Sequence, residues 1–212
     1  MTIQSLPYRS INKITRWLSI FTILSIVSYA IVLFSFVFSE LLILSIYASL
    51  LGLIALPVTP IIGLYWYYRA TKNIHSFGAK KVTSPRMAVI WWFVPFVQLW
   101  KPYFVSQQIW KASDTGVKLI EGTEWKTSPS SNLIKIAWLL SLASVVGNAI
   151  VNIFLDTLTG EDQFSYSLFD VNDPILKLFK ILFHFTMIIS LIFYIPIIRT
   201  ISVRQQLKSG QV

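Results

Sequence analysis

The chain has no cysteine and only two histidines among its 212 residues. Without cysteine it can form no disulfide, thiolate nucleophile or thiolate metal site. Its nine acidic residues lie without the spacing of a catalytic carboxylate pair or a calcium loop, and no glycine-rich phosphate-binding motif occurs. Because no combination of residues indicates a nucleophile, a general base or a metal centre, we expect a protein that is not an enzyme and holds no metal.

Charged residues are also scarce, at 13% of the chain, whereas about a quarter of the residues in a soluble domain are charged. Hydrophobic residues make up 55%, and the mean hydropathy is +0.65. This composition is typical of an integral membrane protein, and too little polar chain remains for a separate soluble domain. We therefore expect one membrane domain, residues 1–212, and no binding of nucleic acid.

Four segments are apolar over the roughly 20 residues that a helix needs to cross a bilayer. No small-residue cleavage site follows the first of them, so we expect a retained helix and not a signal peptide. Pro57, Pro60 and Gly63 should kink the second, because each proline removes a backbone donor. We predict an all-α protein with four transmembrane helices, at residues 17–38, 41–67, 133–155 and 175–198.

A further apolar stretch, residues 84–113, reads SPRMAVIWWFVPFVQLWKPYFVSQQIWKAS and is interrupted by Pro95 and Pro102. We expect a helix over residues 85–94, an irregular turn over 95–101 and a second helix from Pro102, since proline is well tolerated as the first helical residue. The bilayer core offers no water to the backbone groups freed at the breaks, so the stretch has to pack against the other helices. We predict a re-entrant or interfacial segment that enters and leaves by the same face.

The basic residues predict the orientation of the chain. If residues 84–113 do not cross, 16 of the 18 basic residues gather on one side of the membrane, and basic residues are retained in the cytoplasm. Residues 1–16 and 199–212 are then cytoplasmic tails, and the acidic loop of residues 156–173 is external. A fifth crossing would invert everything after it, so we reject that interpretation.

Aromatic residues stand beside basic ones in the interrupted segment, an arrangement that anchors a chain at headgroup depth. We predict that this surface docks onto lipids, a partner membrane protein or a second copy of the chain. The predicted docking residues are Trp91, Trp92, Pro95, Trp100, Lys101, Pro102, Tyr103 and Trp110. Nearby cations could hold an anionic lipid headgroup, although the topology alone requires the same charges. These cations are Arg69, Lys80, Lys81, Arg86 and Lys111.

A block of about residues 65–113 carries a family resemblance. The runs YYRATKN, SPRMAVIWWFVPFVQLWKPY and QIWKAS resemble the bacterial domain of unknown function family 4328, a group of small polytopic membrane proteins. Arg86, Met87 and Lys101 depart mildly from the pattern of that family. The resemblance implies a multi-pass protein of the bacterial inner membrane, and it implies no activity.

His184 lies inside the last predicted helix. An ionisable residue within a membrane is a functional hypothesis by default, here a proton relay or an axial ligand to haem or chlorophyll. The alternative is a neutral histidine that hydrogen-bonds a neighbouring helix. His75 is expected to be a solvated loop residue that cannot share a metal with His184. Apart from the haem or chlorophyll alternative, we predict no cofactor.

Polar side chains form a stripe on the third predicted helix, at helical spacings of three, four and four. Such residues usually serve helix packing in lipid, and the alternative is a polar passage for a solute. The stripe consists of Ser141, Ser144, Asn148 and Asn152.

Two classes of function therefore stay open. The first is an accessory or assembly component that docks onto partner proteins or lipids through its tryptophan-rich segment. The second is a small channel or transporter that uses the polar stripe.

Overall fold

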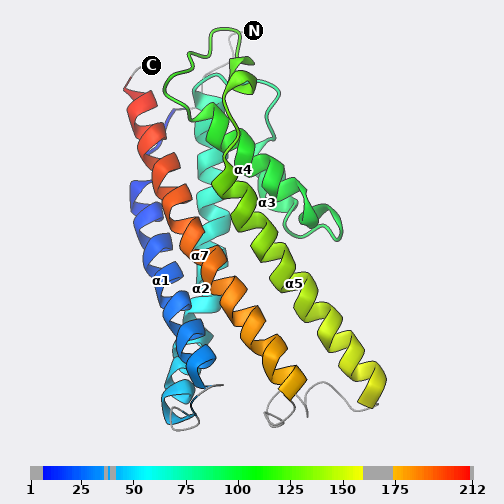
Figure 1. Cartoon of the computed structure of the whole chain (residues 1–212). Coiled ribbons are helices and arrows are strands. Elements are labelled where there is room, and N and C mark those ends of the chain that lie inside the picture. The colour runs from blue at the N-terminus through cyan, green and yellow to red at the C-terminus, as the bar shows by residue number, and fades with distance from the viewer. Residues whose placement is uncertain (1–6, 36–37, 39–41, 160–173, 211–212) are drawn as a thin grey trace.

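The computed structural model describes residues 7–35, 38, 42–159 and 174–210, and the regular elements within these ranges are all helical (Figure 1). Four helices are long and apolar enough to cross a membrane, which confirms the predicted all-α fold with four spanning helices. These are α1 (Asn12–Ser35), α2 (Leu42–Ser76), α5 (Asn132–Thr159) and α7 (Pro174–Ser209). Shorter elements lie between α2 and α5: α3 (Pro85–Ile90), η2 (Val97–Leu99), α4 (Lys101–Ala112) and η3 (Glu124–Thr127).

The long helices extend beyond their most apolar parts. α2 continues through Pro57 and Pro60 to Ser76, and α7 continues past the predicted end at residue 198 to Ser209. These extensions are too polar to be recognised as part of an apolar run in the sequence. They are helical because they pack on α4 and on the start of α1. The predicted turn at residues 39 and 40 and most of the predicted acidic loop lie outside the described residues.

The four long helices form two pairs. α1 packs along α2, α5 packs along α7, and α1 also contacts α7, so that the pairs are joined through α1 and α7. Figure 1 shows that α1 begins and α7 ends at the same end of the bundle, beside α4, and that the two pairs diverge toward the other end. We call these the α4 end and the far end.

Small and hydroxylated residues hold α1 against α2. The Ser28 hydroxyl donates to the Ala48 carbonyl at 2.8 Å, and a Cβ atom on Gly52 would lie 2.7 Å from the Ser28 oxygen. Near the α4 end, the indole N–H of Trp66 donates to the Thr15 hydroxyl at 2.9 Å. Glycine and serine let two helices approach closely where lipid supplies no hydrophobic force between them.

The α4 end contains the buried core. Its apolar part is built from residues of the N-terminal segment, α2, α4, α5 and α7, and it includes Ile11, Ile74, Ile109, Ile134 and Ile201. Its polar centre is Gln205, which is 0% exposed. The Gln205 amide donates to the Ala70 carbonyl and the Ser113 hydroxyl, both at 3.1 Å, and accepts from Asn73 at 2.9 Å. One side chain of α7 thus joins α2 and the end of α4.

The interrupted segment forms a short helix, a turn and a second helix, in the predicted order. α3 ends at Ile90, four residues before the predicted end, and turns follow it. Phe96 has a φ of 62° and lies at the centre of a tight turn in which the Val97 N–H donates to the Pro95 carbonyl at 2.7 Å. α3 and α4 are each too short to cross a bilayer. That the segment enters the bilayer stays a prediction.

Trp92 and Trp138 attach this segment to the spanning helices. The Trp138 indole N–H of α5 donates to the Leu99 carbonyl at 3.2 Å. The Trp92 ring packs edge-on between Tyr67 at 5.8 Å and Trp138 at 5.7 Å, measured between ring centroids. The segment therefore bridges α2 and α5, which belong to different helix pairs.

We expect Gly52→Val to lower the free energy of unfolding by more than about 1 kcal/mol, because the new side chain would force the Ser28 hydroxyl from its bond to Ala48. Thermal unfolding of the detergent-solubilised protein measures this effect. Gly147→Val is the matched control, since nothing lies within 4 Å of a Cβ atom there. Equal stabilities of the two variants would contradict the close packing of α1 on α2.

We expect Trp138→Phe to destabilise the protein by about 1 kcal/mol, since it removes the donor to the Leu99 carbonyl. Faster hydrogen exchange at residues 97–100 should accompany the loss. Trp17→Phe serves as the control, because Trp17 is 58% exposed. An exchange rate at residues 97–100 that is unchanged in Trp138→Phe would contradict this role of the indole.

Candidate functional site

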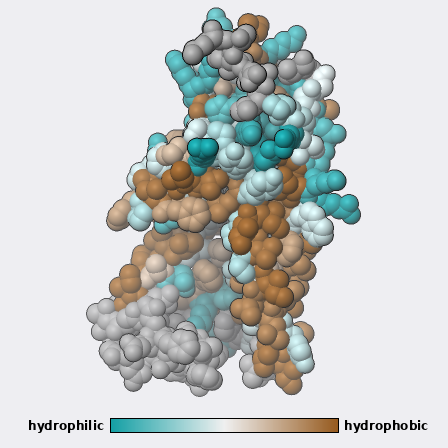
Figure 2. All heavy atoms as spheres, turned by 180° about the vertical axis from the view of Figure 1, so that it is seen from behind, coloured by the Kyte–Doolittle hydropathy of each residue, from teal (hydrophilic) through white to brown (hydrophobic). Residues whose placement is uncertain are grey.

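A cavity of about 460 Å³ lies between the two helix pairs, under the interrupted segment. Figure 2 shows the molecule from behind, with a recess in its lower half in which hydrophilic side chains lie behind apolar ones. The walls come from α1, α2, α5 and α7, and Trp92, Gln98 and Leu99 of the interrupted segment cover the cavity on the side of the α4 end. Because the helix pairs diverge, the cavity is open at the level of the spanning helices.

The lining is apolar and aromatic, with uncharged polar groups set into it. Aliphatic residues such as Leu56, Leu142 and Leu191 make the walls, and Trp66, Tyr67, Trp92 and Trp138 make the covered end. None of the described lining residues is an aspartate, glutamate, lysine, arginine or histidine. The lining residues with a hydroxyl or amide group are Thr22, Ser25, Tyr29, Thr59, Tyr67, Gln98, Ser141, Ser190 and Tyr194.

The serine and threonine hydroxyls of the lining are bonded within the protein. Thr22 donates to the Leu18 carbonyl at 2.7 Å, and Thr59 donates to the Ala55 carbonyl at 2.7 Å. Between helices, Ser141 and Ser190 share a hydrogen bond of 2.6 Å. Such bonds satisfy each hydroxyl proton inside lipid, where an unpaired donor is costly.

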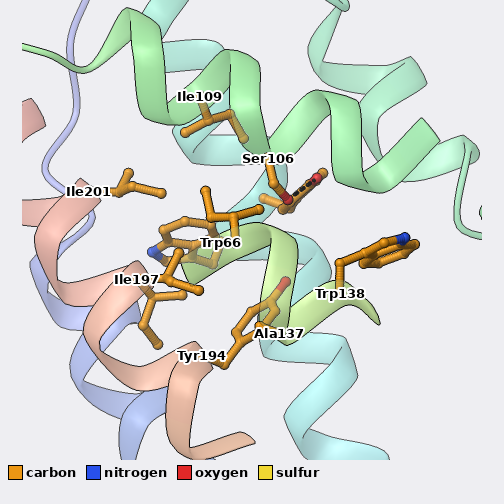
Figure 3. A pocket seen from close by; sticks show the side chains of 11 residues that line it. Trp66, Ser106, Ile109, Ala137, Trp138, Tyr194, Ile197 and Ile201 are labelled. Atoms are coloured by element: carbon orange, nitrogen blue, oxygen red, sulfur yellow. Dashed lines mark hydrogen bonds between the residues drawn. The ribbon is translucent and has the colours of Figure 1, made fainter. Parts of the chain in front are cut away.

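A second, very small pocket marks the packed layer between the cavity and α4 (Figure 3). Its volume is about 10 Å³, which is room for one water at most. Figure 3 shows Trp66, Trp138 and Tyr194 around it, and the Tyr67 hydroxyl shares a bond of 2.8 Å with Ser106 of α4. The cavity is therefore closed toward the α4 end.

The predicted docking residues do not share one surface. Trp92 lines the cavity and Pro102 is buried, whereas Trp100 is 44% exposed. The Lys101 ammonium lies 5.6 Å from the centroid of the Trp91 ring, and the Arg204 guanidinium of α7 lies 4.1 Å from the centroid of the Trp110 ring of α4. Pro95 is exposed and Tyr103 is half-buried. Docking through these residues stays a prediction, and the structure divides them between the cavity and the outer face.

The predicted lipid-contacting cations also differ in exposure. Lys80, Lys81 and Arg86 are exposed, and Lys111 is half-buried. Arg69 is only 8% exposed, so little of it can reach a headgroup. All five belong to the α4 end, together with the basic residues near the start of α1 and the end of α7.

The polar stripe on α5 meets α7 over part of its length. Ser141 bonds Ser190, and Ser144 bonds Thr186, so these two hydroxyls hold the helix pair together. Asn148 is exposed, and the side chain of Asn152 lies outside the described residues. Among the described members of the stripe, Ser141 alone lines the cavity.

One histidine lies inside the last spanning helix, as expected, and the other at the end of α2. The Nδ1 atom of His184 lies 2.7 Å from the Lys180 carbonyl of its own helix, and its ring packs edge-on against Tyr29 at 5.6 Å. His75 belongs to the last turn of α2, is half-buried and lies 3.0 Å from the Thr83 carbonyl. The expectation of a solvated loop histidine is therefore wrong, because the chain after α2 folds back over its end.

Sequence reasoning missed several residues of the cavity. Tyr29, Thr59, Gln98 and Tyr194 line it, but they come from separate segments and form no motif in the sequence. A signal was present in α1, where five hydroxylated residues recur every three or four positions and are buried. They are Thr15, Ser19, Thr22, Ser25 and Ser28.

No group of three or more histidine, cysteine, aspartate or glutamate side chains that could hold a metal ion occurs among the described residues. What the geometry offers is a partly open cavity with apolar walls and uncharged polar groups.

Comparison with known families matched one model, described as a domain of unknown function (DUF4328), over residues 42–171. That range covers α2, the interrupted segment and α5, and hence two of the four walls of the cavity together with its covered end. Comparisons with curated proteins and with solved structures gave no match. The chain belongs to the DUF4328 family, and it is a multi-pass membrane protein of that family.

Proposed function

We propose that this protein is a non-enzymatic membrane protein that binds a lipid-like molecule in the cavity between its helix pairs. The observation that supports this proposal is the cavity itself. Its volume of about 460 Å³ falls in the range of about 300–1,000 Å³ found for ligand sites. It also lies between helices long enough to span a membrane, so a lipid can enter from the bilayer without crossing water.

The chemistry of the lining favours such an occupant. Leucine side chains and aromatic rings offer dispersion contacts along an acyl or isoprenoid chain. The bilayer is as apolar as the walls, so transfer of a chain into the cavity adds little hydrophobic free energy. Selective binding therefore depends on shape and on the few polar groups.

The interrupted segment has two faces in this proposal. Trp92, Gln98 and Leu99 cover the cavity, while Phe93, Phe96 and Phe104 are exposed on the outside. Exposed aromatic rings next to Lys101 suit the bilayer interface, so the lipid form of the predicted docking is the one we favour. The role of an accessory subunit stays a prediction.

Conduction of a solute is a weaker proposal. A channel needs a passage across the molecule, and the layer that includes Trp66, Tyr67 and Ile109 closes the cavity toward α4. Binding of haem or pigment through His184 has no supporting geometry either, since His184 is not among the described residues that line the cavity.

We also propose that the α4 end faces the cytoplasm and that the membrane is the bacterial inner membrane. The basic residues of this end support the orientation, because basic residues are retained in the cytoplasm. The basic residues grouped there are Arg9, Lys13, Arg16, Arg69, Lys72, Lys80, Lys81, Arg86, Lys101, Lys111, Lys118, Lys126, Lys135, Arg199, Arg204 and Lys208.

Single-cysteine labelling tests this orientation on a chain that has no cysteine of its own. We expect a membrane-impermeant maleimide to label Ser165→Cys in intact spheroplasts. Lys118→Cys should react only after the membrane is permeabilised. The opposite pattern would reverse the orientation.

A bulky residue at Gly63 tests the cavity as the binding site. Gly63 lines the cavity, and the nearest atom to a Cβ there lies 3.9 Å away, so Gly63→Phe should fold and occupy part of the space. We expect it to reduce the lipid that co-purifies with the protein at least fivefold, measured by native mass spectrometry. Gly147→Phe, a glycine outside the cavity, is the matched control. Undiminished lipid in Gly63→Phe would refute the proposal.

A further inference from the structure

Resting on the proposed function, we infer that the bound molecule is an uncharged amphiphile whose hydroxyl or carbonyl end lies at the covered end of the cavity, hydrogen-bonded to Tyr194 and Gln98. This inference concerns the chemical class and the direction of the occupant. It depends on three features of the lining: the absence of charged residues, the hydrogen bonds that its serine and threonine hydroxyls make within the protein, and the positions of the polar groups that make no such bond.

The lining excludes a charged head inside the cavity. No described lining residue carries a charge, and an unpaired ion placed in apolar surroundings is strongly disfavoured. Cations of the α4 end pack instead on rings that do not line the cavity, as with Lys101 over Trp91 and Arg204 over Trp110. A phosphate that enters the cavity would therefore lose its water and find no counter-charge.

Four polar groups of the lining make no hydrogen bond to any described residue, and one of them, the indole N–H of Trp92, is buried. The other three, the hydroxyls of Tyr29 and Tyr194 and the side-chain amide of Gln98, remain available to a ligand. The serine and threonine hydroxyls beside them donate to carbonyls of their own helices, as Thr22 and Thr59 do. In lipid, a free phenol or amide gains a partner only from a bound molecule or from water.

The available groups differ in depth. Tyr194 lies among Tyr67, Trp138 and Ile198 beside the small pocket, and Gln98 precedes Leu99, whose carbonyl accepts from Trp138. Both therefore belong to the covered end. Tyr29 lies nearer the far end, where its ring meets His184.

The depth of these groups sets the direction of the occupant. Tyr194 and Gln98 together offer donors and acceptors, which match a hydroxyl or a carbonyl. A molecule with this head at the covered end extends its chains toward the far end, past Tyr29. If the α4 end is cytoplasmic, this is the orientation of a lipid in the cytoplasmic leaflet.

Two lipids with the same chains test the inference. Dioleoylglycerol ends in a hydroxyl, and dioleoylphosphatidic acid differs from it only by a phosphate. We expect the full-length protein, purified and delipidated in detergent, to bind dioleoylglycerol at least tenfold more tightly, measured by native mass spectrometry titration. Equal or tighter binding of the phosphatidic acid would overturn the inference.

Two substitutions locate the head. Tyr194→Phe removes one hydroxyl, so we expect the affinity for dioleoylglycerol to fall about fivefold, as for the loss of one hydrogen bond. The affinity for phosphatidic acid should not change. Tyr65→Phe is the control, because Tyr65 is 55% exposed and does not line the cavity. Gln98→Leu gives a second measurement on an exposed side chain, and it should lower the affinity for dioleoylglycerol to a similar degree. Unchanged affinity in both Tyr194→Phe and Gln98→Leu would overturn the assignment of the head.

The outcomes separate this inference from the proposed function. Cavity binding stands, and the inference fails, if Gly63→Phe blocks both lipids while phosphatidic acid binds at least as well as dioleoylglycerol. The proposed function fails, and the inference with it, if both lipids bind Gly63→Phe as they bind the unaltered chain.

Discussion

The hydrogen bonds of Gln205 are the interaction on which the rest of the structure depends. Its amide lies fully buried and bonds Ala70, Asn73 and Ser113, so α2, α4 and α7 meet at one point. A buried amide is favourable only when its partners hold their positions, which makes the α4 end a rigid unit. The Lys208 ammonium strengthens that unit, since it donates to the carbonyls of Ala112, Asp114 and Val117.

The helix pairs are packed together at the α4 end and diverge toward the far end (Figure 1). α1 and α2 are held together by Ser28 and Gly52, and α5 and α7 by Ser141 and Ser144, so each pair has close contacts of its own. Between the pairs, α1 contacts α7, and the interrupted segment bridges α2 and α5 through Trp92. The space left between the diverging pairs is the cavity, and Trp92 and Trp138 mark its closed limit.

Parts of the fold could be predicted from residues that follow simple rules. Apolar runs of about 20 residues indicated four spanning helices, and the proline at the start of α4 indicated where the second short helix begins. The ends of α2 and α7 could not be predicted this way, because Asn73 and Gln205 are polar yet buried against each other. The cavity was missed for a similar reason: its lining comes from single residues of separate segments, such as Tyr29 and Tyr194.

By itself the sequence determined the class of protein, the number of long helices and the gathering of basic residues at one end, since each depends on composition along a single segment. Only the tertiary structure decided that Ser141 and Ser144 hold α7, that Trp92 turns inward while Trp100 stays outside, and that a cavity lies between the pairs. These features depend on which helix faces which. In lipid, that choice follows from close packing and individual hydrogen bonds between distant residues, and a hydrophobic pattern carries little information about either.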